Sequence, residues 1–267
     1  MSALRGRRIV VTRAAAQADA LAAPLRAAGA EPVLVPTIAI APPDPCTALD
    51  AALRSLADHE WVVFTSVNGV QAALARANAL GLRAEAWRHV RIAAVGPATA
   101  SALGTHGLYA IGMPAEHRSE RVVDVMGDVQ GARVLLLRGE LARPALPRLL
   151  EARGARTTDV IAYRTLAAPP DPGAAVRIAG ADAITFTSTS TAHGLAGVLG
   201  DGWRVTLEGV AVASIGPVTS RALEEMGLPV AVEATQYTVP GLIAALERFF
   251  GRDRSAAQIG PDVRSGA

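Results

Sequence analysis

The sequence predicts an α/β protein of two domains, each a doubly wound parallel sheet with helices on both faces. Short β-branched runs alternate with helical patterns along most of the 267 residues, which is typical of parallel sheets. The pattern of the first half also returns in the second, so that the turn at Gly96 is repeated at Gly216. Apolar residues make up 51% of the chain and aromatic residues only 4%, which favours a core of Ala, Val, Leu and Ile.

The first half begins with a buried strand and a helix that ends at Gly29. Short apolar runs predict strands or extended segments at 8–12, 32–40, 61–65, 91–95 and 109–113. Amphipathic patterns predict helices at 17–28, 46–57, 66–80, 99–107 and 119–126.

The second half repeats this order, and the helix of its first unit ends at the matching Gly154. Extended segments are expected at 133–137, 158–166, 183–187, 210–215 and 229–233. Helices are expected at 141–153, after Ser188, after the turn at Gly216, and at 238–250, where Thr238 is a suitable N-cap. Residues 251–267 are polar and contain Gly and Ser, which predicts a loose tail.

Two proline-rich linkers, at 42–45 and 169–172, set the expected domain boundaries. Each linker follows the first βαβ unit of a half, whereas a simple division would place one linker between the halves. The first βαβ unit of one half is therefore expected to pack with the remainder of the other. This gives a discontinuous first domain (1–36 plus 168–250), a second domain (41–163) and the polar tail (251–267). The chain would cross twice between the domains, forming a two-strand hinge over a cleft.

Composition excludes several classes of chemistry. All 26 basic residues are arginine, so a Schiff-base lysine, a pyridoxal phosphate anchor and a P-loop lysine are impossible. Cys46 is the only cysteine, which rules out an intramolecular disulfide and a thiolate metal cluster. The five histidines are scattered and no G-x-G-x-x-G fingerprint is present. We therefore expect neither a metal nor a cofactor.

Charge and hydropathy also bear on partners and location. The first residues lack the apolar segment of a signal peptide, and no run approaches the roughly 20 apolar residues of a membrane span. The arginines are spread along the chain, which is unlike a nucleic-acid-binding patch. These patterns predict a cytoplasmic protein that binds neither membrane nor nucleic acid.

Polar residues follow the predicted strands, where ligands bind in doubly wound sheets. They are hydroxyl residues, Asn, Gly and Arg at Thr12, Arg13, Thr65, Ser66, Asn68, Gly96, Thr99, Arg138, Thr187, Ser188, Ser190, Gly216 and Thr219, together with Tyr163 in an extended segment. A lone Ser or Thr here is ordinarily a helix N-cap, and each Arg is equally explained as a solvated strand-end charge. Their paired recurrence favours a site for a ligand with many negative groups, because helix N-termini bind anions.

The chain resembles the uroporphyrinogen-III synthase family from about Arg7 to Phe250. The likeness rests on seven pieces in order. They are VVTR from Val10, FTSVNGV from Phe64, AVGPATASAL from Ala94, LLRGELARPAL from Leu136, VIAYRT from Val160, FTSTST from Phe186 and SIGPVTSRAL from Ser214. The resemblance implies two flavodoxin-like domains joined by a two-stranded β-ladder. It also implies an enzyme that closes hydroxymethylbilane to uroporphyrinogen III, with loss of water and inversion of ring D, in tetrapyrrole and haem synthesis.

The family also implies roles for particular residues. Tyr163 matches the tyrosine proposed to assist loss of the hydroxyl, and Thr99, Thr219, Ser66 and Ser188 match residues that hold substrate carboxylates. Asn68 stands where some members carry Arg, so Arg13 or Arg138 is expected to supply that charge.

The resemblance implies partners as well. The expected ligand is a linear tetrapyrrole polycarboxylate, which hydroxymethylbilane synthase would hand over. The protein itself is expected to be a monomer. Two alternatives remain open at this point. A non-catalytic two-lobed binding protein for a small polyanion would share the double crossing, and a sugar-nucleotide transferase would share the two lobes.

Overall fold

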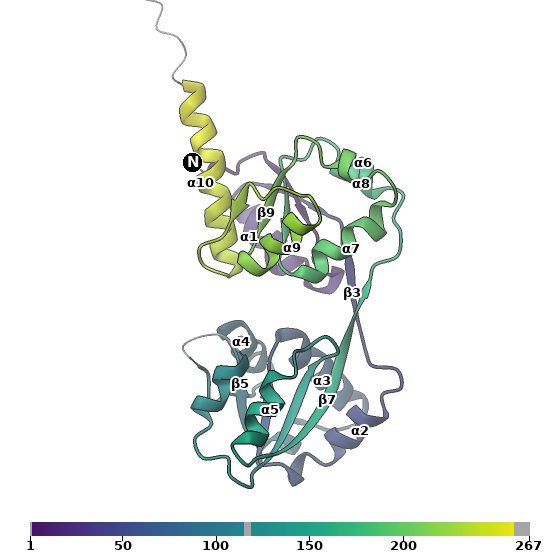
Figure 1. The fold of residues 1–267 in the computed structure, drawn as a ribbon, viewed down its shortest axis with the longest axis vertical. Coiled ribbons are helices and arrows are strands. Elements are labelled where there is room, and N and C mark those ends of the chain that lie inside the picture. Colours follow the sequence, from purple (N-terminus) through teal and green to yellow (C-terminus); the bar gives the residue numbers. More distant parts are fainter. Residues whose placement is uncertain (1, 115–118, 259–267) are drawn as a thin grey trace, which may run out of the picture. The chain divides into compact units, whose positions relative to one another are not determined.

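The structure is a computed structural model that describes residues 2–114 and 119–258 (Figure 1). Within these residues the chain forms two compact units. Unit 1 is formed by the described chain up to Ala39 and from Leu166 onward, and unit 2 lies within Ile40–Thr165. Unit 1 is therefore built from the two ends of the chain, whereas unit 2 is continuous in sequence.

The sheet of unit 1 has five strands in the order β10-β9-β8-β1-β2. The strands are β1 (Arg8–Val11), β2 (Glu31–Leu34), β8 (Ala183–Phe186), β9 (Ala211–Ser214) and β10 (Val232–Glu233). All neighbouring pairs are parallel, and Val10 pairs with both Val33 and Ile184. Numbered within the unit, this is the flavodoxin order 2-1-3-4-5, which confirms the predicted fold class.

Helices cover both faces of this sheet because successive strand side chains point to opposite sides. Ile9 and Val11 pack against Leu21 and Leu246, whereas Val10 packs against Leu195 among others on the opposite face. The first face carries η1 (Ala15–Gln17), α1 (Asp19–Ala27) and α10 (Val239–Gln258); the second carries α6 (Ala174–Ile178), α7 (Thr189–Leu199), α8 (Trp203–Thr206) and α9 (Pro217–Glu225). The short helix η1 leads into α1.

The sheet of unit 2 has the order β3-β7-β6-β4-β5. Its strands are β3 (Ile38–Ala41), β4 (Trp61–Phe64), β5 (Arg91–Ala94), β6 (Arg133–Gly139) and β7 (Arg156–Ala167). The β4–β5, β4–β6 and β6–β7 pairs are parallel. A single parallel bridge joins Ala93 to Gly112, where a full strand was expected at 109–113. If β3 is set aside, the remaining strands can be numbered from β6 as the first, followed by β7, β4, β5 and the bridge at Gly112. The spatial order is then again 2-1-3-4-5.

Helices also cover both faces of the second sheet. Phe64 and Leu137 pack on one face with α2 (Thr47–Arg54), η2 (Leu56–Asp58), α3 (Val67–Ala79), η3 (Ala84–Trp87) and α4 (Pro97–Gly104). Val63 and Leu136 pack on the other face with η4 (Ser119–Val125) and α5 (Ala145–Ala152). The segment expected as an α-helix at 119–126 is thus a 3-10 helix.

The chain crosses between the units through β3 and β7, which are hydrogen-bonded neighbours. This confirms the two-stranded ladder. The crossing is fixed to unit 1 at Thr37, whose buried hydroxyl donates to the carbonyl oxygen of Thr191 at 2.7 Å. The Thr37 carbonyl accepts from the Ala168 amide at 3.0 Å. Gly194 in α7 allows this approach, since a Cβ there would lie 2.1 Å from the Thr37 oxygen.

The expected tail needs a correction. Helix α10 continues beyond Phe250 to Gln258, where a loose segment was predicted from 251 onward. The physical reason is that Arg, Ala and Gln in this stretch favour helix, and a single glycine at 251 does not stop one that is already formed. The remainder of the predicted tail, 259–267, lies outside the described residues.

Strands β6 and β7 carry an irregularity in register beside Arg138. Arg138 pairs with Ile161 but Gly139 pairs with Tyr163, so Ala162 is an extra residue in β7. The buried Arg138 guanidinium donates from Nε to Asp159 at 2.8 Å and from Nη1 to the Arg143 carbonyl at 2.7 Å, and Nη2 also bonds Asp159. All three nitrogens of the guanidinium thus make a hydrogen bond within the fold, and the expected role of Arg138 in binding substrate stays a prediction.

Two glycines of α7 test the fixing of the crossing. We expect Gly194→Ala to destabilise unit 1 by about 3 kcal/mol, because the new methyl group overlaps the Thr37 carbonyl. Gly197→Ala meets no atom within 4 Å and should stabilise by roughly 0.5–1 kcal/mol, because alanine favours helix. Hydrogen exchange of unit 1 amides in urea measures both changes. Equal effects at the two positions would contradict the tight contact at Thr37.

A second pair of variants tests the anchoring of Arg138. Asp159→Asn leaves a buried guanidinium without its counter-charge, so unit 2 should lose about 2 kcal/mol of stability. Glu140→Gln removes the partner of Arg164 in an ion pair whose side chains are more than a third exposed, and should cost less than about 1 kcal/mol. Urea unfolding of each variant gives the comparison. A cost for Asp159→Asn no larger than for Glu140→Gln would show that the Arg138 pair does not hold β6 and β7 together.

Candidate active site

All fourteen residues selected from the sequence lie near the carboxyl ends of the parallel strands. We call these two sheet edges the carboxyl edge of unit 1 and the carboxyl edge of unit 2. Unit 1 contributes Thr12, Arg13, Thr187, Ser188, Ser190, Gly216 and Thr219. Unit 2 contributes Thr65, Ser66, Asn68, Gly96, Thr99, Arg138 and Tyr163. Parallel strands bring their carboxyl ends to one edge, which explains the grouping within each unit.

The clearest contact in unit 2 joins Ser66 to Tyr163. Ser66 is the N-cap of α3, and its Oγ accepts from the Gly69 amide at 3.1 Å. The same hydroxyl donates to the Tyr163 oxygen at 3.1 Å. Because the Gly69 N–H occupies one acceptor position of Ser66, the serine proton is free to point at the tyrosine. Both residues are half-buried, so the tyrosine is held in place by this bond while part of the residue stays exposed.

Two glycines that the sequence reasoning did not select make this contact possible. A Cβ on Gly139 would lie 2.7 Å from the Cζ atom of Tyr163, so glycine lets the tyrosine ring approach the end of β6 this closely. A Cβ on Gly69 would lie 2.9 Å from the Leu137 carbonyl oxygen, so glycine also brings the start of α3 close to β6. A glycine directly at the end of a strand is the signal that identifies such a position.

Two hydroxyls at the carboxyl edge of unit 1, those of Thr12 and Ser188, make hydrogen bonds to the backbone. Thr12 is fully buried, and its Oγ1 donates to the Thr185 carbonyl at 2.7 Å. The hydroxyl of Thr12 faces the neighbouring strand, and the expected role of Thr12 in binding substrate stays a prediction. Ser188 caps α7 by accepting from the Thr191 amide at 3.3 Å, as the N-cap interpretation expected. Thr187 and Ser190 beside it are half-buried.

The repeated Gly-Pro-x-Thr turns have the same local structure in both units. Gly96 and Gly216 are the N-caps of α4 and α9, and a proline follows at the first helical position of each. Thr99 and Thr219 lie in the first turns with 5% and 4% of their surface exposed. Any contact with a ligand would therefore come mainly from the helix N-termini. The expectation that Thr99 and Thr219 face each other across a cleft stays a prediction.

Arg13 differs from Arg138 in having unused bonding capacity. Its Nε is buried and has no hydrogen-bond partner among the described residues. Burial lowers the pKa of the Arg13 guanidinium, because the charged form is less well solvated. A half-buried cation with a free donor at a sheet edge is suited to a carboxylate. Thr65 and Asn68 at the carboxyl edge of unit 2 are also half-buried.

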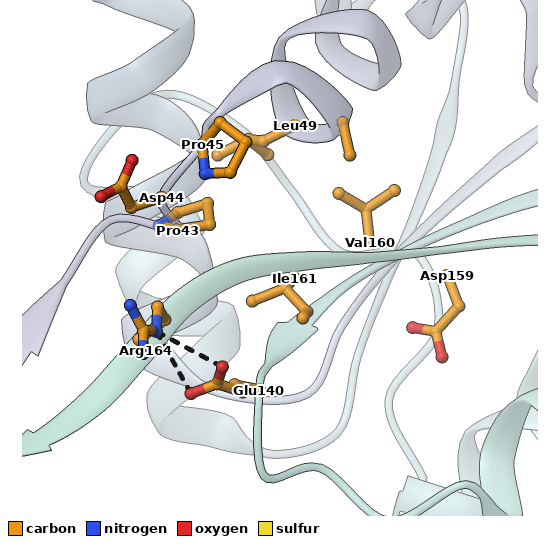
Figure 2. Close-up of a pocket in the computed structure, with 10 residues that line it drawn as sticks. Pro43, Asp44, Pro45, Leu49, Glu140, Asp159, Val160, Ile161 and Arg164 are labelled. Carbon is orange, nitrogen blue, oxygen red and sulfur yellow. Dashed lines mark hydrogen bonds and ion pairs between the residues drawn. The ribbon is translucent and has the colours of Figure 1, made fainter.

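A separate pocket of about 360 Å³ lies beside β7 in unit 2 and contains none of the predicted site residues (Figure 2). Its ionisable lining groups are Asp44, Glu140, Asp159 and Arg164, and Figure 2 shows the ion pair between Glu140 and Arg164. Because Asp159 is paired with Arg138 and Glu140 with Arg164, the lining has no excess of positive charge to attract a polyanion. This pocket therefore does not suit the ligand that the sequence predicts.

Among the described residues, no helix has both the length and the apolar character needed to cross a membrane.

Comparison with known proteins identifies the family. The family model described as uroporphyrinogen-III synthase HemD matches residues 19–244. A uroporphyrinogen-III synthase of Synechococcus elongatus is 37% identical over 257 residues, covering 92% of this chain and 96% of the relative. These matches do not favour the non-catalytic binding protein as an alternative.

Solved structures support the fold. A mutant uroporphyrinogen III synthase of Thermus thermophilus superposes with a TM-score of 0.60 at 23% identity, covering 92% of this chain and 100% of the other. A Helicobacter pylori uroporphyrinogen-III synthetase gives 0.58 at 16% identity, with 90% and 97% covered. Sequence and family model together show that this chain belongs to the uroporphyrinogen-III synthase family.

Proposed function

We propose that this protein closes hydroxymethylbilane to uroporphyrinogen III, with loss of water and inversion of ring D. Family membership supports the activity. The observation that carries the mechanism is the hydrogen bond between Ser66 and Tyr163 at the carboxyl edge of unit 2. The oxygen of this tyrosine hydroxyl already accepts a hydrogen bond from Ser66, and the hydroxyl lies where ligands bind in this class of sheet.

The substrate carries eight carboxylates, and the two carboxyl edges offer groups that bind them. Arg13 supplies a cation with an unpaired Nε, and Ser66 and Ser188 lie at the first turns of α3 and α7. The first backbone N–H groups of a helix have no partner within the helix and carry partial positive charge. In this proposal Arg13 replaces the charge that Asn68 lacks, because Arg138 is committed to Asp159.

Tyr163 acts as the acid that assists departure of the hydroxyl group. Its oxygen accepts from Ser66, which in turn accepts from the Gly69 amide, so the tyrosine proton is left to donate to the substrate. Each bond in such a chain polarises the next. The hydroxyl leaves as water and an azafulvene cation remains, stabilised by the electron-rich pyrrole.

The rest of the reaction needs orientation more than acid or base strength. The free bilane loses its hydroxyl spontaneously and closes to the symmetric type I isomer. To give type III, the substituted carbon of ring D must attack the cation and form a spiro intermediate. This intermediate then fragments and recloses with ring D inverted, and loss of a proton, which restores the hydroxyl of Tyr163, restores the pyrrole. A site of fixed hydroxyls and helix N-termini supplies the required proximity and orientation.

Three further expectations accompany this proposal and stay predictions. They are a cytoplasmic location, a monomeric state, and transfer of the substrate from hydroxymethylbilane synthase. The first rests on the single cysteine, Cys46, which suits a reducing compartment.

A coupled assay tests the activity. Porphobilinogen and its deaminase generate hydroxymethylbilane in the presence of this protein, and the oxidised products are resolved into type I and type III uroporphyrin. We expect type III to predominate. Type I alone, at the level found without this protein, would reject the proposed function.

Tyr163→Phe tests the acid. We expect turnover to type III to fall roughly ten- to a hundredfold, at or below the low end of the usual effect of a general acid, because the substrate ionises readily without help. The fold should persist, since the ring still packs on Gly139. Tyr109→Phe is the matched control, because Tyr109 is exposed and follows the carboxyl end of α4. An unchanged rate in Tyr163→Phe would remove this hydroxyl from the mechanism.

A further inference from the structure

Tyr237 repeats in unit 1 the arrangement that Tyr163 has in unit 2. The chain has three tyrosines, and two of them lie against a glycine at a carboxyl edge. Tyr237 follows β10, and a Cβ on Gly216 would lie 2.8 Å from its Cδ1 atom. The ring therefore rests on the glycine that caps α9. The Tyr237 residue is nevertheless 66% exposed, so much of its side chain faces solvent.

The backbone around this ring is firmly fixed. Thr238 accepts from the Gly241 amide at 3.1 Å, which caps the first turn of α10. Its own amide donates to the Gln236 carbonyl at 2.8 Å. A Cβ on Gly241 would lie 2.1 Å from that carbonyl oxygen, so the turn closes only with glycine there. An exposed aromatic side chain on a rigid turn has little conformational entropy to lose when a ligand covers it.

The Tyr237 ring and the start of α9 together match one pyrrole ring of the proposed substrate. The face of an aromatic ring stacks on other flat rings, and the adjacent start of α9 carries the partial positive charge of a helix N-terminus. A pyrrole with carboxylate side chains matches both features, because its ring can stack while a carboxylate approaches the helix. Neither of the other two tyrosines combines these features. Tyr163 has its hydroxyl bonded to Ser66, and Tyr109 stands where no strand ends.

We propose that Tyr237 is a substrate-binding residue, whose ring, held on Gly216, stacks on one pyrrole of the linear tetrapyrrole. This inference rests on the proposed function and extends it to a residue at the carboxyl edge of unit 1. By holding one ring, Tyr237 reduces the number of ways in which the bilane folds, and so favours the type III isomer over spontaneous closure.

Substitutions at Tyr237 separate stacking from other roles. Tyr237→Leu should raise KM for hydroxymethylbilane about three- to tenfold, the range expected for loss of an aromatic pair, and leave kcat within about twofold. At limiting protein concentration the fraction of type III product should fall. Tyr237→Phe keeps the stacking face and should retain both values. Tyr109→Leu removes a tyrosine that is also largely exposed and serves as the matched control, with no change expected.

A double-mutant cycle with Gly216 tests the contact itself. Gly216 has extended backbone that alanine also adopts, so Gly216→Ala acts by displacing the tyrosine ring. We expect it to raise KM in the parent protein but to add nothing in the Tyr237→Leu background. Thermal unfolding confirms that each variant is folded.

The outcomes distinguish the two proposals. If the parent protein makes type III product and Tyr237→Leu leaves KM unchanged, the role of Tyr237 is rejected and the proposed function stands. Equal loss in Tyr237→Phe and Tyr237→Leu assigns the effect to the hydroxyl and rejects stacking. Additive effects of Gly216→Ala and Tyr237→Leu reject the contact as the cause. Type I product alone from the parent protein rejects the proposed function, and this inference with it.

Discussion

The close approach of Tyr163 to Gly139 is the contact on which the candidate site of unit 2 depends. It requires a residue without a side chain at the end of β6 and one extra residue, Ala162, in β7. It also requires that the two strand ends stay together, which the buried Arg138 and its partner Asp159 ensure. The backbone of β6 and β7 and the buried Arg138–Asp159 pair thus position the Tyr163 hydroxyl. Ser66, the N-cap of α3, then donates a hydrogen bond to it.

Much of the fold followed from local patterns. Alternating short apolar runs and helices identified the parallel sheets, and the displaced proline linkers identified the exchange of βαβ units between the halves. These signals succeed because burial of strands and the special backbone at Gly and Pro act over a few residues. The end of α10 was missed because Gly251 was taken as a helix stop and the polar residues after it as a tail, although Arg, Ala and Gln favour continuing a helix that has already formed.

The candidate site was predicted less completely, because side-chain partners lie far apart in sequence. Thr12 follows β1 and Arg138 lies near the end of β6, yet Thr185 and Asp159 accept hydrogen bonds from their side chains. A strand-end position indicates which edge a residue joins but not which way its side chain turns. The same limit hid Tyr237, since nothing near it in sequence shows that its ring rests on Gly216. The arginine-rich composition similarly overstates the free positive charge, because many arginines pair with carboxylates of their own unit.

The discontinuous course of unit 1 has a consequence for synthesis on the ribosome. Unit 2 is continuous and all of its strands have been made once β7 emerges, whereas β1 must wait for its second neighbour, β8. Val33 and Ile184 both pair with Val10, and at roughly 5–20 residues per second their emergence is separated by about 8 to 30 seconds. During that interval one side of β1 has no partner strand. The nascent chain therefore completes its middle before its beginning.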